Sequence, residues 1–242
     1  MPDGLLLLHA FPLDHTMWEP QAAAFRGACT VVTPDFPGFG DSAPPALPPT
    51  MDSAADAAAE AMTRAGIGRA VICGLSMGGY VALAFVRRHP ARVRGLVLAN
   101  TRADADDEAA RERRAALAAR LRGEGNILAE NPPPLLSEAA PPALVARVKG
   151  IIARQSPESI ARAAEAMATR HNALGDLAAI TVPTLVITSS GDTLIPPAVT
   201  QSTLAAIPGA RFEIIPAAGH LSNLEAPEAF NALLRDHIRS CD

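Results

Sequence analysis

The chain has 242 residues, an apolar content of 49% and a net charge of −4. This is enough apolar sequence to build one sizeable core, and it argues against disorder. The chain has no basic excess that would attract a nucleic-acid backbone or an anionic membrane surface, so we expect neither as a partner. Lys149 is the only lysine, which removes most Schiff-base and P-loop chemistry.

The cysteines and the first residues narrow the setting further. Cys29, Cys73 and Cys241 are too few and too scattered for a disulfide framework or a four-ligand zinc site. We expect no metal and no cofactor. The leucines at 5–8 follow no basic segment and form too short an apolar run for a signal peptide or a membrane span. We therefore expect a soluble cytoplasmic protein, and no pattern in the sequence predicts its oligomeric state.

Apolar runs alternate with amphipathic segments along the first hundred residues. This alternation is typical of strands that are joined by helices. The expected strands cover residues 5–8, 29–33, 69–74 and 93–99, and the expected helices cover 17–25, 52–65 and the segment from 77 to 89. The third strand leads into a helix through a turn that is rich in glycine.

The alternation stops between residues 102 and 176, where only helical patterns are found. Leu144, Val148 and Ile151 are spaced so that they fall on one helix face. Strands and helices then resume at 184–188, 198–206, 211–215 and 227–238. The pattern predicts a mostly parallel, doubly wound α/β sheet made by residues 1–101 and 177–242, with a helical cap, residues 102–176, inserted after the fourth strand.

A serine between glycines follows the third strand. In Gly74-x-Ser76-x-Gly78, a sharp turn from strand to helix would expose the serine hydroxyl above the sheet, and side chains at the two glycines would collide with the turn. The same five residues also fit an ordinary turn between a strand and a helix. The strand before the turn and the helix after it favour Ser76 as a nucleophile.

A serine nucleophile needs an imidazole base and a carboxylate that orients the base. Because the carboxyl ends of parallel strands meet at one edge of a sheet, residues that follow later strands are candidates. Asp192 follows the fifth expected strand and His220 follows the sixth. Asp192 could also be a simple turn residue, and Asp104 and Asp176 are the competing acids.

The other histidines have other expected places. We expect His9 to brace the neighbouring loop by hydrogen bonding, and His89 and His237 to lie near helix ends. His171 follows a helix of the predicted cap, and His15 lies close to the expected mouth of the site. These last two are the alternatives to His220 for contact with a substrate.

Five motifs in order resemble those of the α/β-hydrolase superfamily. They are the segments 9–13 (His-Ala-Phe-Pro-Leu), 35–42 (with the glycines of an Asp-x-x-Gly-x-Gly-x-Ser loop), 74–79, 191–192 and 219–220. Within the superfamily the chain is similar to small bacterial carboxylesterases and 3-oxoadipate enol-lactonases, including at 194–197 and 223–228. Ala10 departs from the pattern, because the family usually has glycine there.

The resemblance implies where the oxyanion and the substrate would bind. The backbone N–H groups of Phe11 and Met77 would hold the oxyanion of a tetrahedral intermediate. A methyl group at Ala10 restricts the backbone just before the first of these donors. Trp18 and Met167 are candidate walls of the substrate pocket, although apolar side chains are more often plain core.

The resemblance also implies a serine hydrolase that cleaves carboxylic esters or lactones through an acyl-enzyme. The alternatives are a 3-oxoadipate enol-lactonase, a carbon–carbon bond hydrolase and a cofactor-free perhydrolase. From another class, a non-catalytic ligand-binding receptor remains an alternative. Residues 102–176 hold 11 basic and 11 acidic residues, a balance that favours a small neutral or mixed ester over a dicarboxylate lactone.

Overall fold

The computed structural model describes residues 4–241 and contains, within that range, one sheet of six parallel strands. The strands are β1 (Leu5–Leu8), β2 (Val31–Val32), β3 (Ala70–Leu75), β4 (Val93–Ala99), β5 (Thr184–Ser189) and β6 (Arg211–Ile215). The predicted α/β fold with a parallel sheet is confirmed. The second strand is shorter than expected, since only two of its five residues pair with β1.

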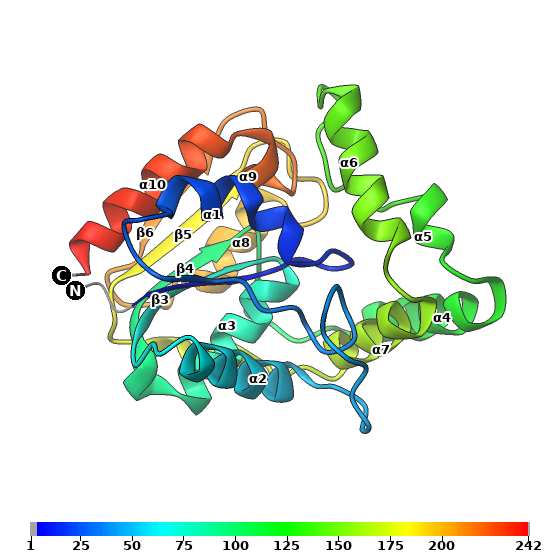
Figure 1. Cartoon of the computed structure of the whole chain (residues 1–242), viewed down its shortest axis with the longest axis horizontal. Coiled ribbons are helices and arrows are strands. Elements are labelled where there is room, and N and C mark those ends of the chain that lie inside the picture. Colours follow the sequence, from blue (N-terminus) through cyan, green and yellow to red (C-terminus); the bar gives the residue numbers. More distant parts are fainter. Residues whose placement is uncertain (1–3, 242) are drawn as a thin grey trace.

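Helices cover both faces of the sheet (Figure 1). The helices of the sheet region are α1 (Glu19–Phe25), α2 (Met51–Arg64), α3 (Met77–Arg88), α8 (Pro197–Leu204), α9 (Ser222–Glu225) and α10 (Pro227–Ser240). Short 3-10 helices cover His15–Trp18, Pro90–Arg92, Ala173–Gly175 and Leu177–Ala179. In Figure 1, α2 and α3 lie below the sheet, and α1 and α10 lie above it.

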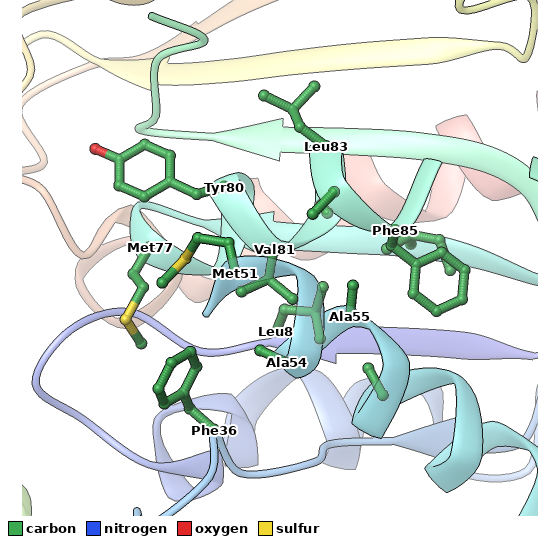
Figure 2. Close-up of a cluster of buried hydrophobic side chains, with 14 of the residues drawn as sticks. Leu8, Phe36, Met51, Ala54, Ala55, Met77, Tyr80, Val81, Leu83 and Phe85 are labelled. Atoms are coloured by element: carbon green, nitrogen blue, oxygen red, sulfur yellow. The ribbon is translucent and has the colours of Figure 1, made fainter. Parts of the chain in front are cut away.

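The leucines of β1 show how the two faces are filled. Side chains alternate along a strand, so Leu6 and Leu8 pack with α2 and α3, whereas Leu5 and Leu7 pack with α1 and α10. All four are buried. A continuous apolar run is therefore what a parallel sheet covered on both faces requires. Figure 2 shows the first cluster, in which Leu8 lies among side chains of α2 and α3.

The order of the strands creates one position where the chain reverses direction across the sheet. The order is β2-β1-β3-β4-β5-β6, so the chain moves from β1 to one side and then returns past β1 to β3. In open α/β sheets, ligands bind beyond the carboxyl ends of the strands at such a switch point. The segments that follow β1 and β3 therefore flank the expected ligand crevice.

Residues 102–176 contain α4 (Glu108–Glu124), α5 (Ile127–Glu130), α6 (Pro142–Ala153) and α7 (Pro157–Ala168) and no strand. In Figure 1 these helices lie together on the side toward which the strands point. Helix α4 begins at Glu108, because the Asp107 side chain accepts a hydrogen bond from the Ala110 N–H (2.7 Å) and caps the helix. The division into a core and a cap remains a prediction.

None of the helices in the described part of the chain is both long and apolar enough to cross a membrane.

Burial of His237 links the fold to pH. Burial lowers the pKa of His237 to about 4, Arg211 contributes in the same direction, and hydrogen bonds with the backbone of Leu96 and Pro183 only partly oppose this. An unfolded histidine titrates near pH 6.5, so the unfolded chain binds the extra proton between about pH 6.5 and 4. The contribution of the neutral His237 to the free energy of unfolding is thus complete above this pH window, and it is lost as the pH falls through the window. We expect His237→Gln to remove about 1 to 2 kcal/mol of the stability difference between about pH 7 and pH 5.

Urea unfolding at the two pH values measures this difference. His171→Gln is the matched control, because it makes the same replacement at an exposed histidine, and the change in His237→Gln is measured relative to it. An equal pH dependence in wild type and His237→Gln would contradict the prediction.

Candidate active site

The turn after β3 holds Ser76 in a strained backbone conformation, with φ 57° and ψ −116°. A Cβ atom at Gly74 would lie 2.1 Å from the Gly78 carbonyl oxygen, and one at Gly78 would lie 2.0 Å from the Leu8 carbonyl oxygen. Backbone cannot retreat from such contacts, so both positions need glycine. The Thr101 hydroxyl donates a hydrogen bond to the Ser76 carbonyl oxygen (2.8 Å) and ties the turn to the end of β4.

His220 and Asp192 form a buried pair at the same edge of the sheet. The distance from His220 Nδ1 to Asp192 Oδ2 is 2.8 Å, and both side chains are almost completely buried. An ionised carboxylate at this position selects the tautomer that carries its proton on Nδ1 and leaves Nε2 free to accept one. The ring is therefore arranged as a base.

Asp192 stays ionised despite its burial. Burial on its own would raise the pKa of Asp192, but hydrogen bonding and charge from His220, the Ile195 N–H and the Asn100 amide outweigh that effect and hold the pKa below its usual value. The second oxygen, Oδ1, accepts hydrogen bonds from the N–H groups of Leu194 (2.9 Å) and Ile195 (3.0 Å). Both carboxylate oxygens are thus fixed.

Asn100 completes this network and is not among the residues that the sequence motifs predict. Its amide nitrogen donates to Asp192 Oδ2 (2.9 Å) and to Ser189 Oγ (2.7 Å), and its amide oxygen accepts from Ser222 Oγ (2.7 Å). Asn100 directly follows β4 and has a positive φ of 45°. The signal that could have found it is its place: a polar residue at the end of a strand, like the other three.

Ser76 and His220 line one cavity of about 400 Å³. Phe11 and Leu194 line it from the sheet edge, and Met167 lines it from α7. This size is within the range of pockets for small organic molecules. The predicted nucleophile and base therefore face a common space, to which helices of the segment 102–176 also contribute.

The two predicted oxyanion donors lie on either side of the switch point. Met77 is the first residue of α3, where an N–H group has no partner within the helix. Among residues 4–241, neither this N–H nor that of Phe11 donates a hydrogen bond to another part of the protein. The side chain of Met77 is buried and in Figure 2 extends toward Phe36, so it belongs to the core instead of the pocket wall.

Trp18 requires a correction. We expected it in the pocket wall, but its side chain is fully buried and does not line the cavity. Its ring packs against Phe230 of α10, with ring centroids 5.9 Å apart. Trp18 is the last residue before α1, and its ring fills the core between this segment and α10.

Ala10 is accommodated without displacing the loop from the sheet edge. Its methyl group is fully buried in the cluster beneath α1 and α10, and its N–H lies 3.1 Å from the Met17 sulfur. His9 braces the same loop: its Nε2 accepts from the Phe36 N–H (2.8 Å) and its Nδ1 lies 3.0 Å from the Ala10 carbonyl oxygen. Burial lowers the pKa of His9, which suits a neutral, structural ring.

The alternative histidines are engaged elsewhere. His171 pairs with Asp176 at an exposed position (2.7 Å), and neither residue lines the cavity of Ser76. His15 Nδ1 lies 2.8 Å from Asp35 Oδ2. The competing acid Asp104 accepts hydrogen bonds from Nε and Nη2 of Arg102, one at each carboxylate oxygen.

One cluster in the described part of the chain has donor atoms suited to a metal ion, namely His15, Asp35 and Asp41. Asp35 already accepts hydrogen bonds from the N–H groups of His15 (2.7 Å) and Asp41 (2.9 Å). A Cβ atom at Gly40 would lie 2.4 Å from Asp35 Oδ2. Through these contacts Asp35 organises the loop that contains it.

Known proteins that resemble this chain in sequence and structure include an esterase and enol-lactonases. The chain is 38% identical to a thermophilic esterase from Thermogutta terrifontis, solved with malate bound, with a TM-score of 0.94 over 98% of this chain and 90% of that one. An enol-lactonase from Burkholderia xenovorans is 30% identical, with a TM-score of 0.89 over 98% of this chain and 91% of that one. The 3-oxoadipate enol-lactonase 2 of Acinetobacter baylyi is 28% identical over 94% of this chain and 85% of its own.

A model of the Alpha/beta hydrolase family matches residues 5–233, which is nearly the whole chain and includes all six strands and every residue of the site described above. This protein therefore belongs to the alpha/beta hydrolase family.

Proposed function

We propose that this protein is a serine hydrolase that cleaves carboxylic esters or lactones, with Ser76 as nucleophile, His220 as general acid and base, and Asp192 as the carboxylate that orients His220. One observation carries the proposal: Ser76 and His220 line one cavity, and the far side of the His220 ring is bonded to a buried, ionised carboxylate. The esterase and enol-lactonases among the similar proteins support it. A lactone is a cyclic ester, so the same residues serve both.

In the acylation step, Ser76 Oγ attacks the carbonyl carbon while its proton passes to Nε2 of His220. Negative charge develops on the carbonyl oxygen, and the N–H groups of Phe11 and Met77 stabilise it. When the tetrahedral intermediate collapses, the bond to the leaving alkoxide breaks. His220 returns the proton to that oxygen, which leaves as an alcohol.

In the deacylation step, a water molecule attacks the acyl-enzyme and gives its proton to His220. The second tetrahedral intermediate collapses to a carboxylic acid, and Ser76 recovers the proton. Asp192 stabilises the imidazolium in both steps without taking the proton itself.

We further propose that residues 102–176 act as a cap over a core of residues 1–101 and 177–242, because Leu117 of α4 and Met167 of α7 supply walls of the cavity.

Labelling with a fluorophosphonate tests the assignment of the nucleophile. The probe forms a covalent bond with an activated serine, so we expect stoichiometric labelling of wild type and none of Ser76→Ala. Ser202→Ala is the matched control, because Ser202 is an exposed serine of α8, and we expect it to label like wild type. Equal labelling of wild type and Ser76→Ala would remove Ser76 from the mechanism. Absence of labelling in every protein would favour a non-catalytic receptor.

A further inference from the structure

One face of α4 lines the active-site cavity and carries two arginines. The lining residues of this helix are Ala110, Arg113, Arg114 and Leu117, a spacing of three, four and seven residues that places them on the same side of a helix. A helix face over a purely apolar pocket would carry apolar side chains at the two central positions. This wall of the pocket is therefore suited to contact a polar or charged group of a ligand.

Positive charge exceeds negative charge around this wall. Asp106 lines the cavity and accepts hydrogen bonds from both Arg114 and Arg170. Arg102, which also lines the cavity, is bound to Asp104. Two carboxylates thus pair with three guanidinium groups. Arg113 adds a fourth positive charge at the same wall.

Arg113 has no such partner. Within residues 4–241 it makes no hydrogen bond or ion pair with another residue, and its side chain is exposed at the cavity. Its neighbour Arg114, by contrast, is bound to Asp106 and only partly exposed. Arg113 is thus a cation that is free to bind a ligand. It lines the same cavity as Ser76, the candidate nucleophile.

We propose that the cavity accepts esters that carry a free carboxylate remote from the bond to be cleaved, and that Arg113 binds this carboxylate. The inference rests on the proposed function and names its substrate class. A guanidinium presents a rigid fork of N–H donors that matches both oxygens of a carboxylate. The equal numbers of acidic and basic residues in 102–176 do not reveal a preference for a carboxylate. Asp104 and Asp106 are already paired with arginines of the protein, so they do not neutralise Arg113.

The test compares two substrates that differ only in charge: monomethyl glutarate and its neutral carboxamide analogue, methyl glutaramate. We expect wild type to prefer the carboxylate. We expect Arg113→Gln to lower kcat/KM for monomethyl glutarate by about 5- to 20-fold, as for a partly exposed charged hydrogen bond, and to leave the carboxamide nearly unchanged. Within residues 4–241, Arg113 makes no hydrogen bond or ion pair that its replacement would break, so the fold should be preserved.

Arg111→Gln is the matched control. Arg111 lies on the same helix, is exposed and does not line the cavity, so the variant removes the same charge without touching the pocket. We expect its preference for the carboxylate to equal that of wild type. Equal losses in the two variants would mean that only the general field of the helix acts, and this would overturn the assignment of Arg113. A wild type without preference for the carboxylate would overturn the substrate class.

A binding measurement separates this inference from the proposed function. Calorimetry of monomethyl glutarate with Ser76→Ala, and with Ser76→Ala combined with Arg113→Gln, requires no turnover. We expect the second protein to bind about 5- to 20-fold more weakly. If wild type cleaves neither ester but binding still depends on Arg113, the hydrolase assignment fails and the carboxylate site stands. If wild type cleaves both esters but binding is independent of Arg113, the reverse holds.

Discussion

Replacing His220 by alanine is expected to lower kcat for an activated aryl ester by about five to six orders of magnitude, as removal of the base does in serine hydrolases. Without the imidazole, the Ser76 hydroxyl has no group to take its proton, and the leaving alkoxide has none to supply one. The measurement is the initial rate under saturating substrate. The backbone donors of Phe11 and Met77 stay in place, so a residual rate above that of water should remain.

Two histidine variants serve as controls for this result. His171→Ala and His15→Ala remove the rings that compete with His220 on sequence grounds alone. His171 lies outside the cavity against Asp176, and His15 is held by Asp35. We expect each variant to keep kcat within about threefold of wild type, as for residues that do not touch the reacting atoms. Undiminished activity in His220→Ala, or a collapse in either control, would reassign the base.

The sequence predicted the strands and the residues that follow them because both depend on local patterns. Apolar runs bounded by turn residues mark the strands, and parallel strands end at a common edge. This rule alone predicts Ser76, Asp192 and His220 as neighbours at that edge. The structure then brings Asp192 and His220 to hydrogen-bonding distance and sets Ser76 and His220 around one cavity.

Other features depend on contacts between distant segments and could not be predicted in the same way. Trp18 is buried because α10, more than 200 residues further along the chain, covers it. Asn100 matters because its amide bonds to Ser189 at the end of β5, to Asp192 in the loop after β5 and to Ser222 at the start of α9. The free charge of Arg113 becomes visible only when the acids near it are seen to be paired with other arginines. Composition reports none of these pairings.

Replacing Asp192 by asparagine is expected to lower kcat by about four orders of magnitude while preserving the fold. The N–H groups of Leu194 and Ile195 both donate to Oδ1, so they would hold the amide oxygen of the new side chain at that position. Its NH₂ group would then face His220 Nδ1 and the amide nitrogen of Asn100, which now share Oδ2. A donor at this position favours the tautomer with its proton on Nε2, which cannot accept the proton of the serine.

Fluorophosphonate labelling distinguishes two causes of lost activity, a misoriented base in Asp192→Asn and a missing nucleophile in Ser76→Ala. Ser76 is intact in Asp192→Asn, so we expect fluorophosphonate labelling that is slow but complete, whereas Ser76→Ala gives none. Asp176→Asn is the matched control, because it also neutralises an aspartate paired with a histidine but lies outside the cavity. Its kcat should remain within about twofold of wild type, as for an exposed ion pair. Wild-type turnover in Asp192→Asn would show that the His220 tautomer does not depend on this carboxylate, and the buried pair would then have a structural role only.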